Sequence, residues 1–291
     1  MIGVLLMAYG TPRGVEEVEA FYTHIRGGRP PTPELLANLR GRYDAVGGST
    51  PLLEISRQQA AGLQAALGPD FRVFLGMKHW RPYIREAVAE MEAAGIRQAV
   101  AMALAPHYSA LSVGAYMQAI EDTGTSIAFR DVRSWHLQPA YLEAVAKHVR
   151  AASDGFDPEV VTFTGHSLPK RILDLGDPYV DQLQATSQAL ASQLELPRWQ
   201  FSFQSAGATG DAWLGPDILE TVDCLAGEGI RRLLVAPIGF ISDHLEILYD
   251  LDVQARQRAA SRGLNLRRTQ SLNASPKLIA ALKAAVLETT V

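Results

Sequence analysis

The chain has little cysteine: among its 291 residues there is only Cys224. One thiol cannot form a disulfide within the chain, and it cannot hold an iron–sulfur cluster, which needs several protein ligands. A disulfide-stabilised scaffold and an iron–sulfur protein are therefore excluded. The composition fits a reducing compartment.

No charge of one sign predominates. The 27 lysines and arginines face 31 aspartates and glutamates, so the formal net charge is −4, and both signs are spread along the chain. A protein that binds nucleic acid would show clustered basic charge, and we therefore expect no nucleic-acid partner. Hydrophobic residues make up 47% of the chain, which is enough for a full globular core.

Long apolar runs are missing as well. Spanning a bilayer takes about 18 to 20 consecutive apolar residues. The richest segments here are the much shorter MIGVLLMAYGTP at the N-terminus and RRLLVAPIGFISDH further on. The first has no basic residues ahead of its apolar run, so it indicates a buried strand and not a signal peptide. We expect a soluble cytoplasmic protein with no integral membrane segment.

Short apolar runs that end in glycine or proline alternate with longer stretches of helical periodicity. The runs are GVLLMAYGTP, FRVFLGMKHW, QAVAMALAPHYS, VVTFTGHSLP and RRLLVAPIGF. This alternation is typical of an α/β fold, in which parallel sheets are flanked by helices. Ligands of such folds bind beyond the carboxyl ends of the strands, where Tyr9, His79, His107, His166 and the segment 240–246 fall.

The chain contains an internal repeat. The segments AAGIRQAVAMALAPHYS and GEGIRRLLVAPIGFISDH share a Gly-Ile-Arg, an apolar strand and an Ala-Pro, and the strand endings MAYGTP and TGHSLP place Tyr9 opposite His166. We therefore predict two similar halves, 1–150 and 151–291, with a Gly-, Pro- and Arg-rich insertion at 26–51 in the first. The final helix, SPKLIAALKAAVLETT, is expected to cross back to the first half.

The segment ISDHLEILYDLDVQARQ concentrates polar side chains directly after an apolar strand. Glu246, Asp250 and Gln254 are spaced by four residues and share one helix face, which a π-turn would align still better. A solvated helix start, where the helix dipole favours acidic residues, gives the same pattern. His166 ends another predicted strand, although a lone histidine is more often structural. An imidazole and carboxylates from two strand ends predict a weak, transient site for a divalent transition metal.

The insertion supplies side chains suited to carboxylate binding: Arg26, Arg29, Arg42 and Tyr43. Surface arginines are common, so a solvated surface is the alternative. His79 and His107 lie beside aromatic residues and are expected to be structural. No Gly-x-Gly-x-x-Gly or P-loop follows a strand, which argues against nucleotide binding.

The motifs resemble those of the ferrochelatase family over nearly the whole chain. The similar segments are MAYGTP, THIRGGRPPTPELL, RYDAVGGSTPL, APHYS, GHSLP, GDPY, FQSAG, WLGPD and PIGFISDHLEILYD. The resemblance implies two Rossmann-like halves of chelatase type with a porphyrin cleft between them. It also implies an enzyme that inserts ferrous iron, Fe2+, into a porphyrin and needs no organic cofactor.

By position, the resemblance assigns the inner metal-binding and catalytic pair to His166 and Glu246. Tyr9 is similar to a tyrosine of the branch that uses coproporphyrin III, in which the phenol oxygen approaches the iron as an axial ligand. A phenolate ligand of haem iron has precedent. Further residues match positions that line the porphyrin or its propionates in that branch: Arg26, Arg42, Tyr43, Thr50 and Tyr116.

The chain departs from the family pattern at Gln254, where relatives often have a third carboxylate, and this weakens an outer metal site. It also has no C-terminal cysteine extension and no hydrophobic membrane-binding lip, so we expect a monomeric bacterial enzyme. The predicted function is the conversion of coproporphyrin III to Fe-coproporphyrin in haem biosynthesis. The alternatives are a protoporphyrin IX ferrochelatase, a cobalt or nickel chelatase, which would present more histidines, and a non-catalytic haem or porphyrin carrier.

Overall fold

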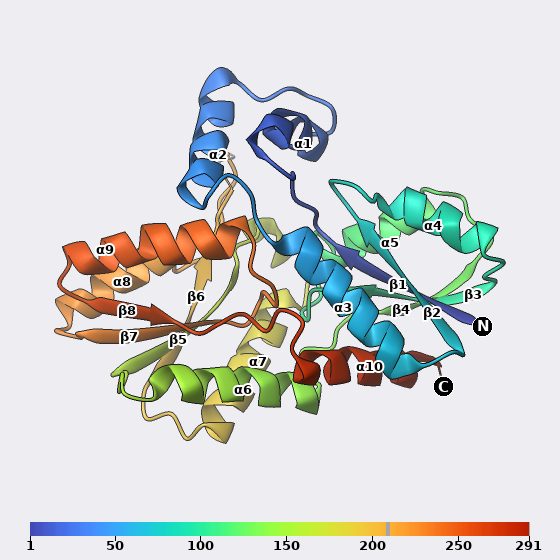
Figure 1. The fold of residues 1–291 in the computed structure, drawn as a ribbon. Helices are drawn as coiled ribbons and strands as arrows, with labels where there is room; N and C mark the ends of the chain where they lie inside the picture. The colour runs from blue at the N-terminus through green and yellow to red at the C-terminus, as the bar shows by residue number, and fades with distance from the viewer. Residues whose placement is uncertain (208–209, 291) are drawn as a thin grey trace.

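The computed structural model describes residues 1–207 and 210–290, which form two four-stranded parallel sheets flanked by helices (Figure 1). The first sheet has the order β2-β1-β3-β4 and the second the order β6-β5-β7-β8. The strands are β1 (Ile2–Ala8), β2 (Phe71–Met77), β3 (Gln98–Ala103), β4 (Ala128–Val132), β5 (Val160–His166), β6 (Trp199–Gln204), β7 (Arg232–Pro237) and β8 (Asn265–Arg268). The predicted α/β fold is confirmed.

The helices that flank the sheets are α1 (Val18–Ile25), α2 (Pro33–Ala45), α3 (Leu52–Leu67), α4 (Ile84–Ala93), α5 (Val113–Glu121), α6 (Pro139–Ser153), α7 (Tyr179–Gln193), α8 (Ile218–Gly227), α9 (Arg256–Ser261) and α10 (Pro276–Thr290). A π-helix, η3 (Glu246–Ala255), runs into α9, and two short 3-10 turns are η1 (Val15–Glu17) and η2 (Lys170–Ile172). The repeated Gly-Ile-Arg motifs precede β3 and β7, which hold the same place in the two sheets.

The inner strands are apolar along almost their whole length because helices cover both faces of each sheet. In β1 six of seven residues are buried, and in β5 the buried residues run up to His166, which is the last residue of that strand. Gly239 lets the chain after β7 approach β5 closely, since a Cβ there would lie 2.7 Å from the Cα of Gly165. This contact brings the segment leading to η3 beside the end of β5.

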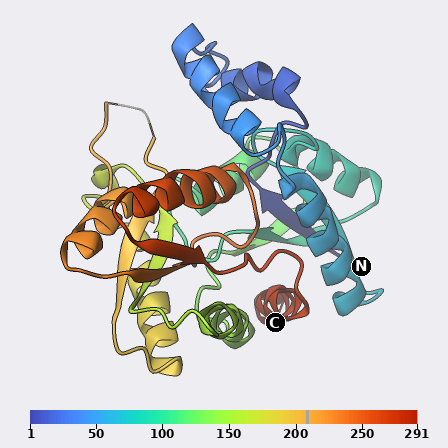
Figure 2. The same cartoon turned by 60° about the vertical axis from the view of Figure 1, so that its left-hand side comes forward.

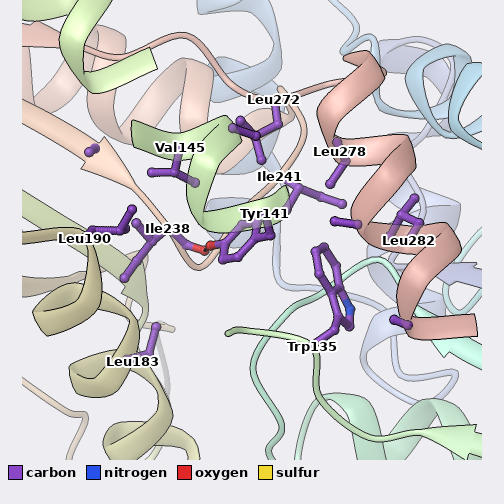
Figure 3. Packing of buried hydrophobic residues seen from close by; sticks show 14 of the residues in the cluster. Trp135, Tyr141, Val145, Leu183, Leu190, Ile238, Ile241, Leu272, Leu278 and Leu282 are labelled. Atoms are coloured by element: carbon purple, nitrogen blue, oxygen red, sulfur yellow. Dashed lines mark hydrogen bonds between the residues drawn. The ribbon is translucent and has the colours of Figure 1, made fainter. Parts of the chain in front are cut away.

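Two helices connect the halves. Helix α10 packs with α3 and β4, while α6 contacts α10, α7 and β7. Figure 3 shows this shared core, in which the buried Tyr141 of α6 donates its hydroxyl to the carbonyl of Ile238 at 2.6 Å, close to Leu278 and Leu282 of α10. The division predicted between residues 150 and 151 falls within α6, and one hydrophobic cluster includes residues of both sheets.

The insertion predicted at 26–51 contains α2, which follows α1; both helices stand outside the two sheets (Figures 1 and 2). Helix α2 begins at Pro33 with the side chain of Thr32 as its N-cap, and its far end packs on η3. Tyr43 and Leu245 are buried there in a small cluster of their own. The insertion therefore reaches the second half of the chain.

Within the described ranges, no helix combines the length and the apolar character needed to cross a bilayer.

Candidate active site

His166 lies at the carboxyl end of β5 with its ring orientation fixed. Its Nδ1 hydrogen-bonds to the carbonyl of Ser167, and its own carbonyl accepts the hydroxyl of Tyr179 at 3.0 Å. Because a carbonyl can only accept, Nδ1 carries the proton in the neutral ring. The lone pair is therefore on Nε2, which is free to bind a metal or a proton.

Glu246, the first residue of η3, lies between two imidazoles. Its Oε1 is 3.5 Å from Nε2 of His166, and its Oε2 is 3.5 Å from Nε2 of His244. Nδ1 of His244 lies 2.9 Å from the carbonyl of Ser242, so His244 also presents Nε2 to the carboxylate. The Glu246 carbonyl accepts the amide of Gln204 at 3.1 Å, which holds the start of η3 against the end of β6.

The charges of this pair shift each other's pKa values. Burial lowers the pKa of His166, but the charge and the hydrogen bond of Glu246 outweigh it, and the net pKa lies above its ordinary value. For Glu246, burial favours the neutral acid, yet interaction with His166 and His244 holds the pKa of the carboxyl well below its usual range. The carboxylate is therefore ionised at neutral pH, and it favours a proton or a cation on His166.

The charge of Glu246 acts on tyrosines from both halves. Burial is the largest cause that raises the pKa of Tyr9 and of Tyr179, and the negative charge of Glu246 is the second. The pKa of Tyr116 is raised by burial first, then by the charge of Tyr9, and then by the charge of Glu246. Burial is also the main cause that raises the pKa of Tyr43 to about 12. The ring of Tyr9 lies 4.6 Å from that of His79. The structure thus brings Tyr9, Tyr43 and Tyr116 into the electrostatic field of the His166–Glu246 pair.

Some residues of the arginine-rich insertion contact the site and others do not. Arg42 forms an ion pair with Asp250 of η3, and its guanidinium lies 4.9 Å from the ring centroid of Tyr249. Thr50 joins the same region through Thr11, whose hydroxyl is 2.8 Å from that of Thr50 and 3.3 Å from that of Tyr43.

Arg26, at the end of α1, instead lies over the ring of Tyr22 at 5.7 Å, and its carbonyl accepts from Nε of Arg29 at 3.4 Å. Its Nε and that of Arg42 are buried without an acceptor among the described residues. Such N–H groups are uncommon in folded proteins, so both guanidinium groups have capacity for a further acceptor.

The helical row predicted over Glu246, Asp250 and Gln254 lies on a π-helix of ten residues, longer than the single turn considered from the spacing. Its exposure changes along the row: Asp250 is buried, whereas Gln254 is exposed. Burial raises the pKa of Asp250, while the charge of Arg42 opposes that shift.

Three residues near the site were assigned no role from the sequence, although His244 lies within the segment 240–246 that was expected at the strand ends. His244 and Tyr179 contact the pair directly, and their signals were their places in DHLE and GDPY. Lys78 follows β2, and its ammonium lies 5.5 Å from the ring centroid of Tyr116. Burial lowers the pKa of Lys78. His79 and His107, expected to be structural, differ: His79 packs on Tyr9, whereas His107 is buried beside Thr186 at 2.9 Å.

Across 1–207 and 210–290, no three side chains of the His, Cys, Asp and Glu types are arranged to hold a metal together. Within this part of the chain, the arrangement offers one imidazole nitrogen and one carboxylate oxygen 3.5 Å apart, with a second imidazole behind the carboxylate.

Solved structures of chelatases have a similar fold. The sirohydrochlorin chelatase SirB from Bacillus subtilis subspecies spizizenii, solved with cobalt, matches 99% of this chain and 95% of its own with a TM-score of 0.60 at 12% identity. CbiX, the terminal enzyme of sirohaem biosynthesis in denitrifying bacteria, matches 98% of both chains with a TM-score of 0.59 at 11% identity. At these identities the likeness concerns the fold alone.

The family is shown by sequence. The ferrochelatase family model matches residues 1–290, and the chain belongs to the ferrochelatase family. It is 44% identical to the ferrochelatase of Herpetosiphon aurantiacus, with 97% of each chain covered. It is 42% identical to the ferrochelatase of Thermus thermophilus, again with 97% of each covered, and 38% identical to the coproporphyrin III ferrochelatase of Bacillus pumilus, with 99% of this chain and 96% of that one covered.

Proposed function

We propose that this chain is a ferrochelatase that inserts Fe2+ into coproporphyrin III to give Fe-coproporphyrin, with the porphyrin held between the two halves. The observation that carries the proposal is the His166–Glu246 pair, with Tyr9 of the other half within the field of its carboxylate. The similarity to coproporphyrin III ferrochelatases supports this substrate, and protoporphyrin IX is the alternative that the generic ferrochelatases among the relatives leave open.

The pair has the chemistry that metal insertion needs. Insertion replaces two pyrrole N–H protons by one Fe2+, so the enzyme must accept protons and bring a divalent cation to the same face of the ring. Two donors that are each about 2.1 Å from one ion lie about 3.4 Å apart at a tetrahedral angle. Nε2 of His166 and Oε1 of Glu246 are 3.5 Å apart. They can hold the cation together. Once the cation has left it, His166 can accept the two pyrrole protons one after the other and pass each to water, since its side chain is partly exposed.

The remaining predicted residues would hold the macrocycle. Tyr9 would approach the iron as an axial ligand from its half of the chain. Arg26 and Arg42 would pair with propionates through their free guanidinium N–H groups, alongside hydroxyls of Tyr43, Thr50 and Tyr116. Holding the ring rigidly on one side would distort it and expose the pyrrole nitrogens. No organic cofactor takes part in this scheme, and we expect the enzyme to act as a cytoplasmic monomer.

The proposal is tested by anaerobic iron insertion with coproporphyrin III and protoporphyrin IX in parallel, followed by loss of porphyrin fluorescence. We expect kcat/KM to favour coproporphyrin III. A preference for protoporphyrin IX would overturn the substrate but keep the chelatase. Binding of both porphyrins without insertion into either would identify a carrier.

Lys78 provides a second test of the substrate. Within the described ranges no carboxylate pairs with its ammonium, which lies over Tyr116. A propionate there would gain a charge-assisted hydrogen bond, so Lys78→Met should raise KM for coproporphyrin III about tenfold with little change in kcat. Lys78→Arg, which keeps the charge, should stay near the wild-type KM. A Lys78→Met loss confined to kcat would contradict a binding role.

The pH dependence of insertion follows from the shifted pKa of His166. The neutral ring is the form that accepts a proton or binds metal, and Glu246 raises the pKa above the ordinary value of about 6.5. On the acid side, kcat/KM should therefore fall with an apparent pKa above about 6.5, because activity is lost as the pH drops through the raised pKa of His166. Stopped assays over the acidic and neutral range would measure this fall. A profile that is flat through neutrality down to acid pH would exclude His166 as the titrating group.

A further inference from the structure

Gln59 connects the first half of the chain to the segment that leads into η3. It lies on α3 and is fully buried. Its amide nitrogen donates to the hydroxyl of Ser242 at 2.9 Å and to the carbonyl of Asn273 at 2.8 Å. Both amide N–H bonds are thus used, and both partners belong to the second half.

The other end of the same amide is unsatisfied: Oε1 of Gln59 is buried with no partner among the described residues. An unpaired buried acceptor costs free energy that an apolar side chain of similar size would avoid. What an apolar side chain cannot supply is the direction of the two donated bonds. Gln59 therefore fixes the position of Ser242 and Asn273 relative to α3, and its unpaired oxygen lowers the stability of the core.

The contact continues into a polar network behind η3. Asp243 accepts hydrogen bonds from Ser271 at 2.7 Å and from the Asn273 amide at 2.9 Å, while its own N–H donates to the Asn273 side chain at 2.9 Å. Arg268 lies 3.5 Å from Asp243 and makes two bonds, of 2.9 and 2.7 Å, to Asp252 of η3. The network thus holds η3 at a point before its start and at a point within it.

Ser242 is also the residue that orients the second imidazole of the site. Its hydroxyl accepts from Gln59, and its carbonyl lies 2.9 Å from Nδ1 of His244, whose Nε2 faces Glu246. A path of direct contacts therefore runs from α3 to the carboxylate, and Gln59 itself is too deeply buried to touch a substrate.

We infer that Gln59 is a positioning residue, which sets the place of Glu246 and His244 relative to the half of the chain that carries Tyr9. The inference rests on the proposed metal-binding role of the His166–Glu246 pair. Loss of the two donated bonds would let Ser242 and the start of η3 move. In other metal sites, loss of a partner that holds a metal ligand in place reduces metal affinity or activity by roughly 10- to 100-fold.

The test compares two glutamines on the same helix. Gln59→Met removes the donors at nearly constant volume. Gln64→Met is the matched control, because the Gln64 amide bonds only within the first half, to the carbonyls of Gly68 and Phe71 and from the N–H of Val73. We expect Gln59→Met to lower kcat for iron insertion by about tenfold or more with the porphyrin Kd unchanged. Gln64→Met should lower only the melting temperature.

Binding of Co2+ alone, measured by calorimetry, provides a reading of the pair that is independent of the porphyrin. Gln59→Met and Ser242→Ala should each weaken Co2+ binding, and the double variant should lose less than the sum of the two. If both methionine variants reduce kcat and Co2+ affinity equally, or if Gln59→Met changes neither, Gln59 has no positioning role. The proposed function and the inference can fail separately. If the wild-type chain inserts no iron, the proposed function is contradicted. If Gln59→Met still weakens Co2+ binding in that case and Gln64→Met does not, the inference stands.

Discussion

His166→Ala is expected to lower kcat for iron insertion by at least roughly 100-fold, the range typical for loss of a general base. The substitution removes Nε2, which carries the lone pair of the ring and lies 3.5 Å from Glu246. The porphyrin-lining residues of the other half are untouched, so the porphyrin Kd from fluorescence quenching should stay close to that of the wild type.

His148→Ala is the matched control, because His148 is a histidine of α6 whose Nδ1 lies 2.8 Å from the backbone oxygen of Gln270. It should leave both turnover and binding unchanged. The paired measurement also separates an enzyme from a carrier. If His166→Ala kept full insertion activity, the proposed centre would be wrong.

Glu246→Gln should have an effect of similar size for a different reason. The amide keeps the shape of the side chain but removes the negative charge that binds a cation, and kcat should fall roughly 100-fold or more. The same charge raises the pKa of His166, so that pKa should fall in the variant. The acid limb of any residual activity should move to lower pH.

Titration of the His166 ring by NMR would measure this shift directly. The control is Glu228→Gln, which removes an exposed carboxylate whose ion-pair partner is Arg198. An unchanged His166 pKa in Glu246→Gln would contradict the coupling, whatever the effect on turnover. A fall in pKa with normal turnover would show that the carboxylate tunes the imidazole but does not deliver metal.

The fold was largely predictable from the sequence because parallel strands that are covered on both faces must be apolar along their length. The runs that end at Ala8, Ala103, His166 and Pro237 correspond to β1, β3, β5 and β7, the two inner strands of each sheet. The repeated Gly-Ile-Arg motif marks β3 and β7, which occupy equivalent places. Tyr9 follows β1 and His166 ends β5, so the two residues lie at corresponding places because their strands occupy equivalent positions in the two sheets.

The contacts of the insertion were not predictable in the same way. The pattern RGRYDAVGG indicates a carboxylate-binding arginine, but the structure pairs Arg42 with Asp250 of η3. The two residues are 208 positions apart in the chain, and no periodicity relates them. Arg26, from the same segment, lies over Tyr22 instead.

By itself the sequence determined the strands β1, β2, β3, β5 and β7, the repeat, and the residue types at the strand ends, because burial and chain direction act locally on each run of residues. Only the tertiary structure decided that His244 faces the second oxygen of Glu246, and that Gln59 joins α3 to the loop before η3. The first contact depends on how the chain turns between Ser242 and Glu246, and the second depends on how the two sheets are packed against each other. That packing arises from the shared core of α6 and α10, of which the sequence indicated only that the last helix crosses back to the first half.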